Sequence, residues 1–380
     1  MKKRKLKILA LMCIPLLAVF CIVAIVAKKR FVGDEPINTL WENSDITKPA
    51  PLASWPWKNV KKDASQRGVT RFETASNDGT TAILFSFDFK TNPNLRWEII
   101  DQDEDDKVPG DNKINYWMRG VGGATRDLNA RGRGKVIAAW NGLFFGYANK
   151  KSDENAEAFH VSPVVLNSKV LYYTANHRWG FGVKNTPRGP VWKTAHLPSR
   201  KWFASLDWGG GSAQCLVLDG KPLKLQPFPA MGAAAMPQPV KSTPAEVGHI
   251  PIFDHMKTAR ASLAWSKDFR HLYVLIIKED DSEGASALAL KYHRALQGGW
   301  TVPDLQKFWL ALQAKNGTLT AMNSDAGDVG QVAFLRADGK YDLLPSRQSG
   351  APYARKTFNP DFKGAPAGGA AMYFYVLDTS

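Results

Sequence analysis

One short segment of the sequence concentrates groups that can do chemistry. Residues 321–328 read AMNSDAGD and bring Asn323, Asp325 and Gly327 together with a hydroxyl and a second carboxylate. The segment follows an amphipathic stretch and a short apolar run, which places it on a turn after a predicted strand. Such a turn is either an ordinary polar loop or the floor of a catalytic pocket, where a carboxylate and an amide would face a substrate.

Two further segments carry groups suited to anions. Arg260 begins a predicted strand, and its guanidinium suits phosphate or carboxylate, although a surface ion pair is the alternative. Gly209, Gly210 and Gly211, in WGGGS, can bring backbone N–H groups close to an anion because glycine lets the chain approach closely. A glycine run alone is a weak signal of an anion site.

The Asn-Gly pair in AAWNGLFFGY ends a predicted buried strand. The Asn141 amide can orient a sugar hydroxyl or a carboxylate. In the alternative interpretation the pair only makes a turn, with Gly142 at positive φ. The residues alone leave both interpretations open.

The sequence shows no familiar metal-binding motif. Residues 101–106 read DQDEDD, but an EF-hand loop needs Gly at its sixth position and Glu at its twelfth, where this chain has Asp106 and Asn112. We therefore predict a solvated acidic loop. The histidines lack a metal-ligand spacing such as H-E-x-x-H. The sequence indicates no cofactor with certainty, leaves a divalent cation open and leaves metal ligands unknown.

These groups must be positioned by a fold made mostly of hairpins. Apolar and β-branched runs bounded by Gly, Asn, Asp and Pro predict strands and hairpins, with turns at Asn167-Ser168 and Asp219-Gly220. The predicted strands and hairpins span residues 81–90, 94–100, 135–145, 163–173, 213–225, 260–278, 318–322, 331–344 and 371–377.

One helix is predicted clearly. Thr301 can be its N-cap, Asp304 completes a capping-box-like start, and Asn316-Gly317 stops it. A second helix is predicted at residues 285–296. Many hairpins and few helices predict an α+β fold with mixed, largely antiparallel sheets.

The N-terminus predicts a membrane anchor. Residues 8–27 carry no charge and would span about 30 Å as a helix, the thickness of a bilayer core. Five basic residues precede this span and three follow it, which favours a cytoplasmic N-terminus and export of the rest. We predict one transmembrane helix in the cytoplasmic membrane and a periplasmic or extracellular domain, with a cleaved secretory signal as the alternative.

Net charge and composition limit the kinds of ligand that the exported part of the chain can bind. The 380-residue chain has a formal charge of +15, and leaving out the eight basic residues beside the anchor gives +7. That charge suits an anionic ligand or an envelope surface, and the lack of a basic stripe with aromatics argues against nucleic acid. We predict residues 1–30 as cytoplasmic tail and anchor, 31–68 as a linker, and 69–380 as the exported domain. Residues 227–240 are predicted as a lid or disordered insertion.

Taken in order, the segments around Asn141, Gly209, Arg260 and Asp325 resemble the phosphodiester glycosidase domain. This is the family of the N-acetylglucosamine-1-phosphodiester α-N-acetylglucosaminidase. The resemblance covers roughly residues 133–344. The family has Asn-Gly-Gly-Phe-Phe where this chain has NGLFF, a GGGP-L element similar to GGGSAQCL, and Arg-Thr-Ala where this chain has Arg-Ala-Ser.

The family signature Asn-Leu-Asp-Gly-Gly-Gly-Ser resembles residues 323–329 of this chain. The chain keeps Asn323, Asp325 and Gly327. Two glycines and the serine of the signature are replaced, by Ala326, Asp328 and Val329.

The resemblance implies a hydrolase that separates a sugar's anomeric carbon from a phosphodiester. The substrate would be a sugar phosphate or polysaccharide of envelope or exopolysaccharide metabolism. Asp325 would act as a base or charge stabiliser, Arg260 and the Gly209–Gly211 backbone would hold phosphate, and Asn141 and Asn323 would position sugar hydroxyls or Asp325 itself.

The resemblance also implies that Gly142 and Gly327 belong to the substrate-binding surface. The alternative function is a non-catalytic envelope protein on the same scaffold that binds a glycan or a partner enzyme. Retained Asn141, Arg260 and Asp325 favour the enzyme, and the altered glycines favour the binding protein.

Overall fold

The computed structural model describes residues 49–101, 113–116, 120–147, 156–175, 177–212, 214–225, 245–247, 257–279, 298–327, 330–346, 355–366 and 369–380. The predicted anchor at residues 8–27, the predicted lid at 227–240, the predicted helix at 285–296 and Asp328 lie outside the described residues. Within the described ranges, no helix is long and apolar enough to cross a bilayer.

The described chain is built from antiparallel sheets. The largest is eight-stranded, in the order β1 (Lys61–Gln66), β2 (Val69–Ala75), β3 (Thr81–Asp88), β17 (His271–Lys278), β16 (Arg260–Ser266), β18 (Leu319–Ser324), β14 (Cys215–Leu218) and β15 (Lys221–Pro222). A six-stranded sheet has the order β21 (Lys356–Phe358), β20 (Tyr341–Leu344), β19 (Val332–Leu335), β6 (Lys135–Asn141), β22 (Met372–Asp378) and β4 (Leu95–Asp101).

Two smaller sheets complete the described strands. The five-stranded sheet has the order β10 (Lys169–Tyr172), β9 (Val164–Leu166), β13 (Trp208–Ser212), β11 (Trp179–Thr186) and β12 (Gly189–His196). The three-stranded sheet has the order β5 (Lys113–Tyr116), β8 (Ala156–His160) and β7 (Phe145–Tyr147).

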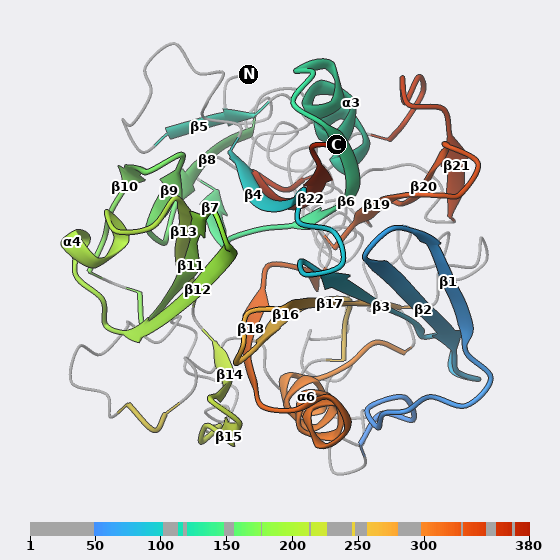
Figure 1. Cartoon of the computed structure of the whole chain (residues 1–380), viewed down its shortest axis with the longest axis horizontal. Helices are drawn as coiled ribbons and strands as arrows, with labels where there is room; N and C mark the ends of the chain where they lie inside the picture. Colours follow the sequence, from blue (N-terminus) through green and yellow to red (C-terminus); the bar gives the residue numbers. More distant parts are fainter. Residues whose placement is uncertain are drawn as a thin grey trace, which may run out of the picture. The chain divides into compact units, whose positions relative to one another are not determined.

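The three larger sheets enclose one apolar core (Figure 1). Trp192 of the five-stranded sheet stacks on Trp265 of the eight-stranded sheet, with ring centroids 4.8 Å apart. Trp97 of the six-stranded sheet lies 4.9 Å from Trp192. Because each sheet turns one apolar face inward, burial of these aromatic side chains is the main force that joins the sheets.

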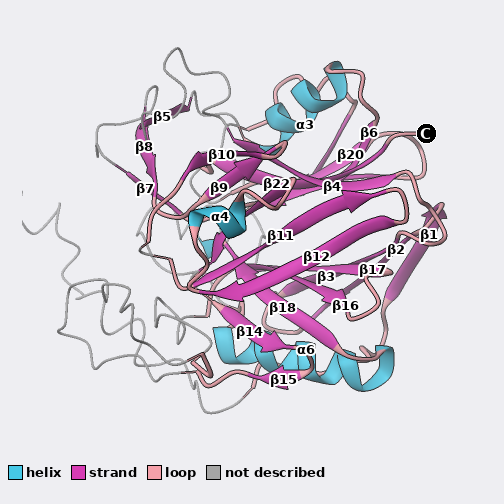
Figure 2. Cartoon of the chain, turned by 60° about the vertical axis from the view of Figure 1, so that its left-hand side comes forward, coloured by secondary structure: helices cyan, strands magenta, loops and turns pink. Residues whose placement is uncertain are grey.

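One helix covers the outer face of each larger sheet. Helix α6 (Val302–Asn316) runs beneath β14 and β18 of the eight-stranded sheet (Figure 2). Helix α3 (Val121–Ala130) packs on the six-stranded sheet, and the short α4 (Arg200–Phe203) packs on the five-stranded sheet. The outer faces are therefore apolar as well, which explains why the central strands read as continuous hydrophobic runs.

The prediction of largely antiparallel sheets with hairpins and few helices is confirmed. The ladders between the named strands are antiparallel, and an isolated parallel bridge joins Lys224 and Val247, which is consistent with the mixed fold that was predicted. Thr301 and Asp304 form the predicted capping box of α6, and the helix ends at Asn316 before Gly317.

The predicted linker belongs in part to the folded domain. Strand β1 lies within residues predicted as linker. Trp57 is buried against Phe308 of α6, and the Ala50 N–H donates to Asp304 Oδ1 at 2.8 Å. The Pro- and Trp-rich composition reflects an irregular segment that packs on a helix rather than a free tether.

Candidate functional site

The segment that follows β18 meets the segment that follows β6. The Asp325 N–H donates to the Gly142 carbonyl oxygen at 3.0 Å, so the ends of a strand from the eight-stranded sheet and a strand from the six-stranded sheet are joined. Asp325 is partly exposed. This hydrogen bond brings together two of the four segments that the sequence predicted to share a site, those of Asn141 and Asp325.

Arg260 lies beside Asp325 at the same end of the eight-stranded sheet. Strands β16 and β18 pair Ala261 with Ser324, so their next residues in this direction are Arg260 and Asp325. Arg260 is 6% exposed, and its Nε donates to the Trp300 carbonyl oxygen at 2.9 Å. Because alternate strand residues share a face, Arg260 lies on the side of the sheet that α6 covers.

Asn323 faces the same side of the sheet and is buried. Its Nδ2 donates to Gln214 Oε1, and its backbone N–H donates to the Gln214 carbonyl oxygen at 3.0 Å. Ser212, at the end of β13, donates through Oγ to the Asn323 carbonyl oxygen at 3.0 Å. The Asn323 Oδ1 atom is buried and accepts no hydrogen bond from the described residues. A buried acceptor in this state costs about 1–3 kcal/mol.

Asn141 fixes the far end of the Asp325 segment. The side chain is fully buried, and Oδ1 accepts a hydrogen bond from the Gln331 N–H at 2.7 Å. Gln331 Oε1 in turn accepts from the Val121 N–H at 2.7 Å, in the first turn of α3. Of the two roles predicted for Asn141, these contacts favour positioning of Asp325 over contact with a sugar.

The two glycines of the predicted surface are used differently. Gly142 does not have positive φ, contrary to the turn interpretation. A Cβ at Gly142 would lie 3.1 Å from the Met372 carbonyl, so the close approach of β22 is what favours glycine there. Gly327 has φ +71° and donates its N–H to the Ala259 carbonyl oxygen at 3.0 Å, which ties the Asp325 segment to the start of β16.

Gly209–Gly211, the predicted phosphate cradle, lie inside a sheet. These glycines lie in the middle of β13, buried between β11 and β9, and the Gly211 N–H donates to the Pro163 carbonyl oxygen at 2.9 Å. A Cβ at Gly210 would collide with Leu143 and lie 2.7 Å from the same carbonyl oxygen. Glycine is needed for close packing of strands and of Leu143, not for an anion.

The sequence analysis missed two buried charged residues, Lys278 and Glu279, at the end of β17. Glu279, directly after β17, is fully buried, and its Oε1 accepts from Thr258 Oγ1 at 2.6 Å and from the Ala259 N–H at 3.1 Å. Lys278 is 1% exposed and donates through Nζ to the Gly330 and Pro345 carbonyl oxygens. Their burial could have been predicted, because the apolar run of β17 continues into both residues without a turn.

Asp101 also differs from its prediction. It was expected to start a solvated acidic loop, but its side chain is buried and its Oδ2 lies 2.6 Å from His160 Nε2. Asp101 lies opposite Met372 in the β4–β22 ladder, and the Met372 carbonyl oxygen accepts from the Gly142 N–H. One strand, β22, therefore separates Asp101 from Gly142. Asp101 ends an apolar strand, and that position was the available signal of its burial. Residues 102–112 lie outside the described chain.

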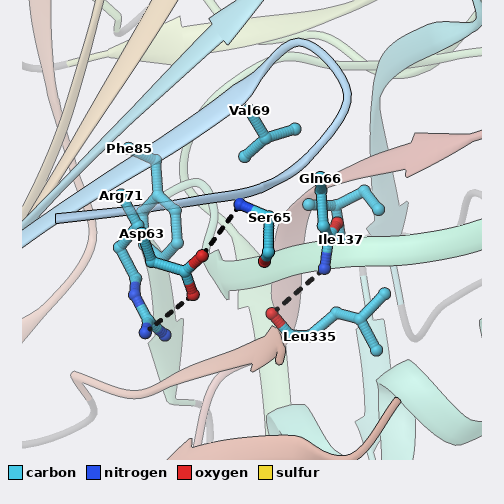
Figure 3. Close-up of a pocket in the computed structure, with 8 residues that line it drawn as sticks. All are labelled: Asp63, Ser65, Gln66, Val69, Arg71, Phe85, Ile137 and Leu335. Atoms are coloured by element: carbon cyan, nitrogen blue, oxygen red, sulfur yellow. Dashed lines mark hydrogen bonds and ion pairs between the residues drawn. The ribbon is translucent and has the colours of Figure 1, made fainter. Parts of the chain in front are cut away.

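Away from the strand ends around Asp325, the described residues offer hollows but no metal cluster. No group of three or more His, Cys, Asp or Glu side chains there could hold a metal ion. A small hollow lies elsewhere, between the β1–β2 hairpin and strands β6 and β19 (Figure 3). It is lined by Asp63, Ser65, Gln66, Val69, Arg71, Phe85, Ile137 and Leu335 and contains no predicted site residue.

Comparison with known proteins gives only distant likenesses. No family model matches the chain, and no curated protein matches it. The chain is similar to the zebrafish N-acetylglucosamine-1-phosphodiester α-N-acetylglucosaminidase catalytic domain auto-inhibited by its pro-peptide, at 9% identity and a TM-score of 0.44, over 90% of this chain and 94% of that one.

Two further solved structures are similar at the same level. A putative exported protein from Burkholderia pseudomallei K96243 has 11% identity and a TM-score of 0.43, over 78% of this chain and 74% of that one. A hypothetical protein from Synechocystis has 11% identity and a TM-score of 0.42, over 85% of this chain. The chain spans 64% of the length of the Synechocystis protein.

Proposed function

We propose that the chain is a phosphodiester glycosidase-like hydrolase that cleaves a sugar-1-phosphodiester at the strand ends around Asp325. The hydrogen bond from the Asp325 N–H to the Gly142 carbonyl oxygen carries this proposal. Together with the β16–β18 register, it supports a shared site for a carboxylate, a guanidinium and two amides from distant parts of the chain.

The chemistry assigns a separate task to each group. Cleavage at the anomeric carbon builds positive charge on the sugar, which the Asp325 carboxylate stabilises or relieves by activating water. Negative charge stays on the phosphate, which Arg260 binds through its guanidinium. Phosphate is already a good leaving group, so the site needs no strong general acid. Asn323, which is buried and bonded to Gln214, positions the strand end that carries Asp325.

The cellular setting follows from the N-terminal sequence. We propose that residues 8–27 anchor the protein in the cytoplasmic membrane with the N-terminus inside, and that the domain acts on envelope or exopolysaccharide material outside. The charge of +7 outside the anchor region favours an anionic substrate at that location.

The test is hydrolysis of a panel of sugar-1-phosphodiesters by the purified full chain, with and without a chelator. Release of free sugar is measured. We expect Asp325→Asn to lower kcat about 10²–10³-fold with the fold intact, as removal of one electrostatic contact in a site does. Arg260→Lys should mainly raise KM, because an ammonium cannot replace a bidentate guanidinium.

Asp361→Asn serves as the matched control. This aspartate is 51% exposed and lies outside the site, so its loss of charge should leave the kinetics unchanged. Full cleavage by folded Asp325→Asn would exclude the assignment of Asp325. Binding of a sugar phosphate by wild-type protein without turnover would instead support the non-catalytic alternative.

A further inference from the structure

We infer that Glu279 is a positioning residue that holds Arg260 and the Asp325 segment in one arrangement. This inference rests on the proposed function, because it concerns the same site. Glu279 lies at the end of β17, two strands from Asp325 in the sheet order. Its role would be to hold Thr258 and Ala259, which directly precede Arg260.

Glu279 binds both the side chain and the backbone of the segment before β16. One carboxylate oxygen accepts from the Thr258 hydroxyl at 2.6 Å and from the Ala259 N–H at 3.1 Å. Glu279 is 0% exposed and Thr258 is 4% exposed, so water does not compete for these bonds. Hydrogen bonds to a buried carboxylate are stronger than neutral ones, which makes this a firm anchor.

The anchored segment contacts the Asp325 loop on one side. The Ala259 carbonyl oxygen accepts from the Gly327 N–H at 3.0 Å. Gly327 adopts the left-handed conformation, so its hydrogen bond fixes a turn that other residues would strain. Movement of Ala259 would therefore move the turn that carries Asp325.

The same segment contacts Arg260 on the other side. Thr258 and Trp300 exchange backbone hydrogen bonds of 3.2 and 3.0 Å, and the Trp300 carbonyl oxygen accepts from Arg260 Nε. Trp300 is fully buried, and Thr301 after it is held in the capping box of α6. The position of the guanidinium thus depends on the position of Thr258.

Charge adds to the geometry. Arg260 pairs with Ile277 across β16 and β17, so Glu279 is its diagonal neighbour on the same face of the sheet. Diagonal neighbours lie about 7–8 Å apart, within reach of long side chains. By register, Arg260 therefore has a carboxylate on each neighbouring strand, Glu279 after β17 and Asp325 after β18, which favours a buried cation at this position.

The experiment compares Glu279→Ala and Glu279→Gln with Glu98→Ala. Glu98 is the control, because it is also buried and also accepts from a hydroxyl, that of Tyr375, but it lies in the middle of β4 in another sheet, where it also pairs with Arg133. Hydrogen exchange at residues 321–327 and 257–266 is measured in the full chain without substrate. Inorganic phosphate then probes Arg260 by competition with sugar-1-phosphodiester cleavage.

We expect Glu279→Ala to speed exchange in both segments, to weaken phosphate binding and to lower kcat/KM about 10–100-fold. Glu279→Gln should recover most of these losses, because its amide oxygen can accept both hydrogen bonds. Glu98→Ala should lower stability alone. Thr258→Val, which removes the hydroxyl with little change in shape, replaces Glu279→Ala if that variant does not fold.

Two outcomes would overturn the inference. One is unchanged exchange in both segments of folded Glu279→Ala or Thr258→Val, and the other is an equal kinetic and exchange effect of Glu98→Ala. Exchange requires no activity, so these results remain decisive even if the wild-type chain cleaves no sugar-1-phosphodiester. In that case the proposed function fails while the positioning by Glu279 is still measured.

Discussion

Replacement of Asp304 by Ala tests how the segment from residue 49 is joined to the domain. Asp304 is 4% exposed and its carboxylate accepts three hydrogen bonds. Oδ2 accepts from the Thr301 N–H at 2.9 Å and from the Thr301 hydroxyl at 2.7 Å. Oδ1 accepts from the Ala50 N–H at 2.8 Å. One side chain therefore starts α6 and holds the preceding segment against it.

The expected cost follows from the donors that Asp304→Ala leaves behind. The Thr301 and Ala50 N–H groups belong to residues that are 4% and 5% exposed, so neither gains a full water partner. Each unsatisfied buried donor costs about 1–3 kcal/mol, which gives about 2–6 kcal/mol for the variant. Thr301→Ala removes the N-cap hydroxyl and its bond to Asp304 but keeps the carboxylate that accepts from both N–H groups, so it should cost about 1 kcal/mol.

The assay is equilibrium urea unfolding followed by tryptophan fluorescence, because Trp57 lies beside Phe308 of α6. We expect a lower midpoint with an unchanged slope for Asp304→Ala, and a smaller shift for Thr301→Ala. The double variant should cost less than the sum of the two, because the side chains belong to one network. A cost for Asp304→Ala no greater than that for Thr301→Ala would refute the role given to the Ala50 contact.

Two further predictions concern packing and pH. Gly210→Ala should lower the free energy of unfolding by about 1–3 kcal/mol or more, because the added Cβ would collide with Leu143 and the Pro163 carbonyl oxygen. An unchanged midpoint of urea unfolding would contradict this packing. Burial lowers the pKa of His177 below 6.5 in the folded chain. As the pH falls, the unfolded chain therefore binds a proton before the folded chain does. The contribution of the neutral ring to folding stability is complete above pH 6.5 and is lost as the pH falls toward the folded pKa. His177→Gln should therefore flatten the decrease in unfolding free energy between pH 7 and 5.5, measured by urea unfolding, whereas an unaltered slope would exclude His177 as its source.

Local structure could be predicted where the chemistry is local. Thr301 and Asp304 are three residues apart, so their capping box needs no information from the rest of the chain. Asn167 and Ser168 adopt positive φ at the tip of the predicted β9–β10 hairpin, and Asp219 does so at the next predicted turn. These turns depend on residue type alone.

The site could be predicted only in part, because its contacts are not local. Asp325 and Arg260 were proposed from residue type and from the order of motifs, but which strand ends meet depends on the pairing of the sheets. The same limit explains the errors. Gly209–Gly211 looks the same in sequence whether it binds an anion or lets strands pack closely. Glu279 reads as an ordinary charged end of a hairpin, and only the fold shows it to be buried.

The place of β22 has a consequence for how the protein is made. This strand pairs with β4 on one side and with β6 on the other, so residues 372–378 join two strands that were synthesised long before them. Until those residues leave the ribosome, β4 and β6 each present an unpaired edge and an apolar face to other chains. Chains that stop before residue 372 should therefore aggregate rather than persist as shortened domains.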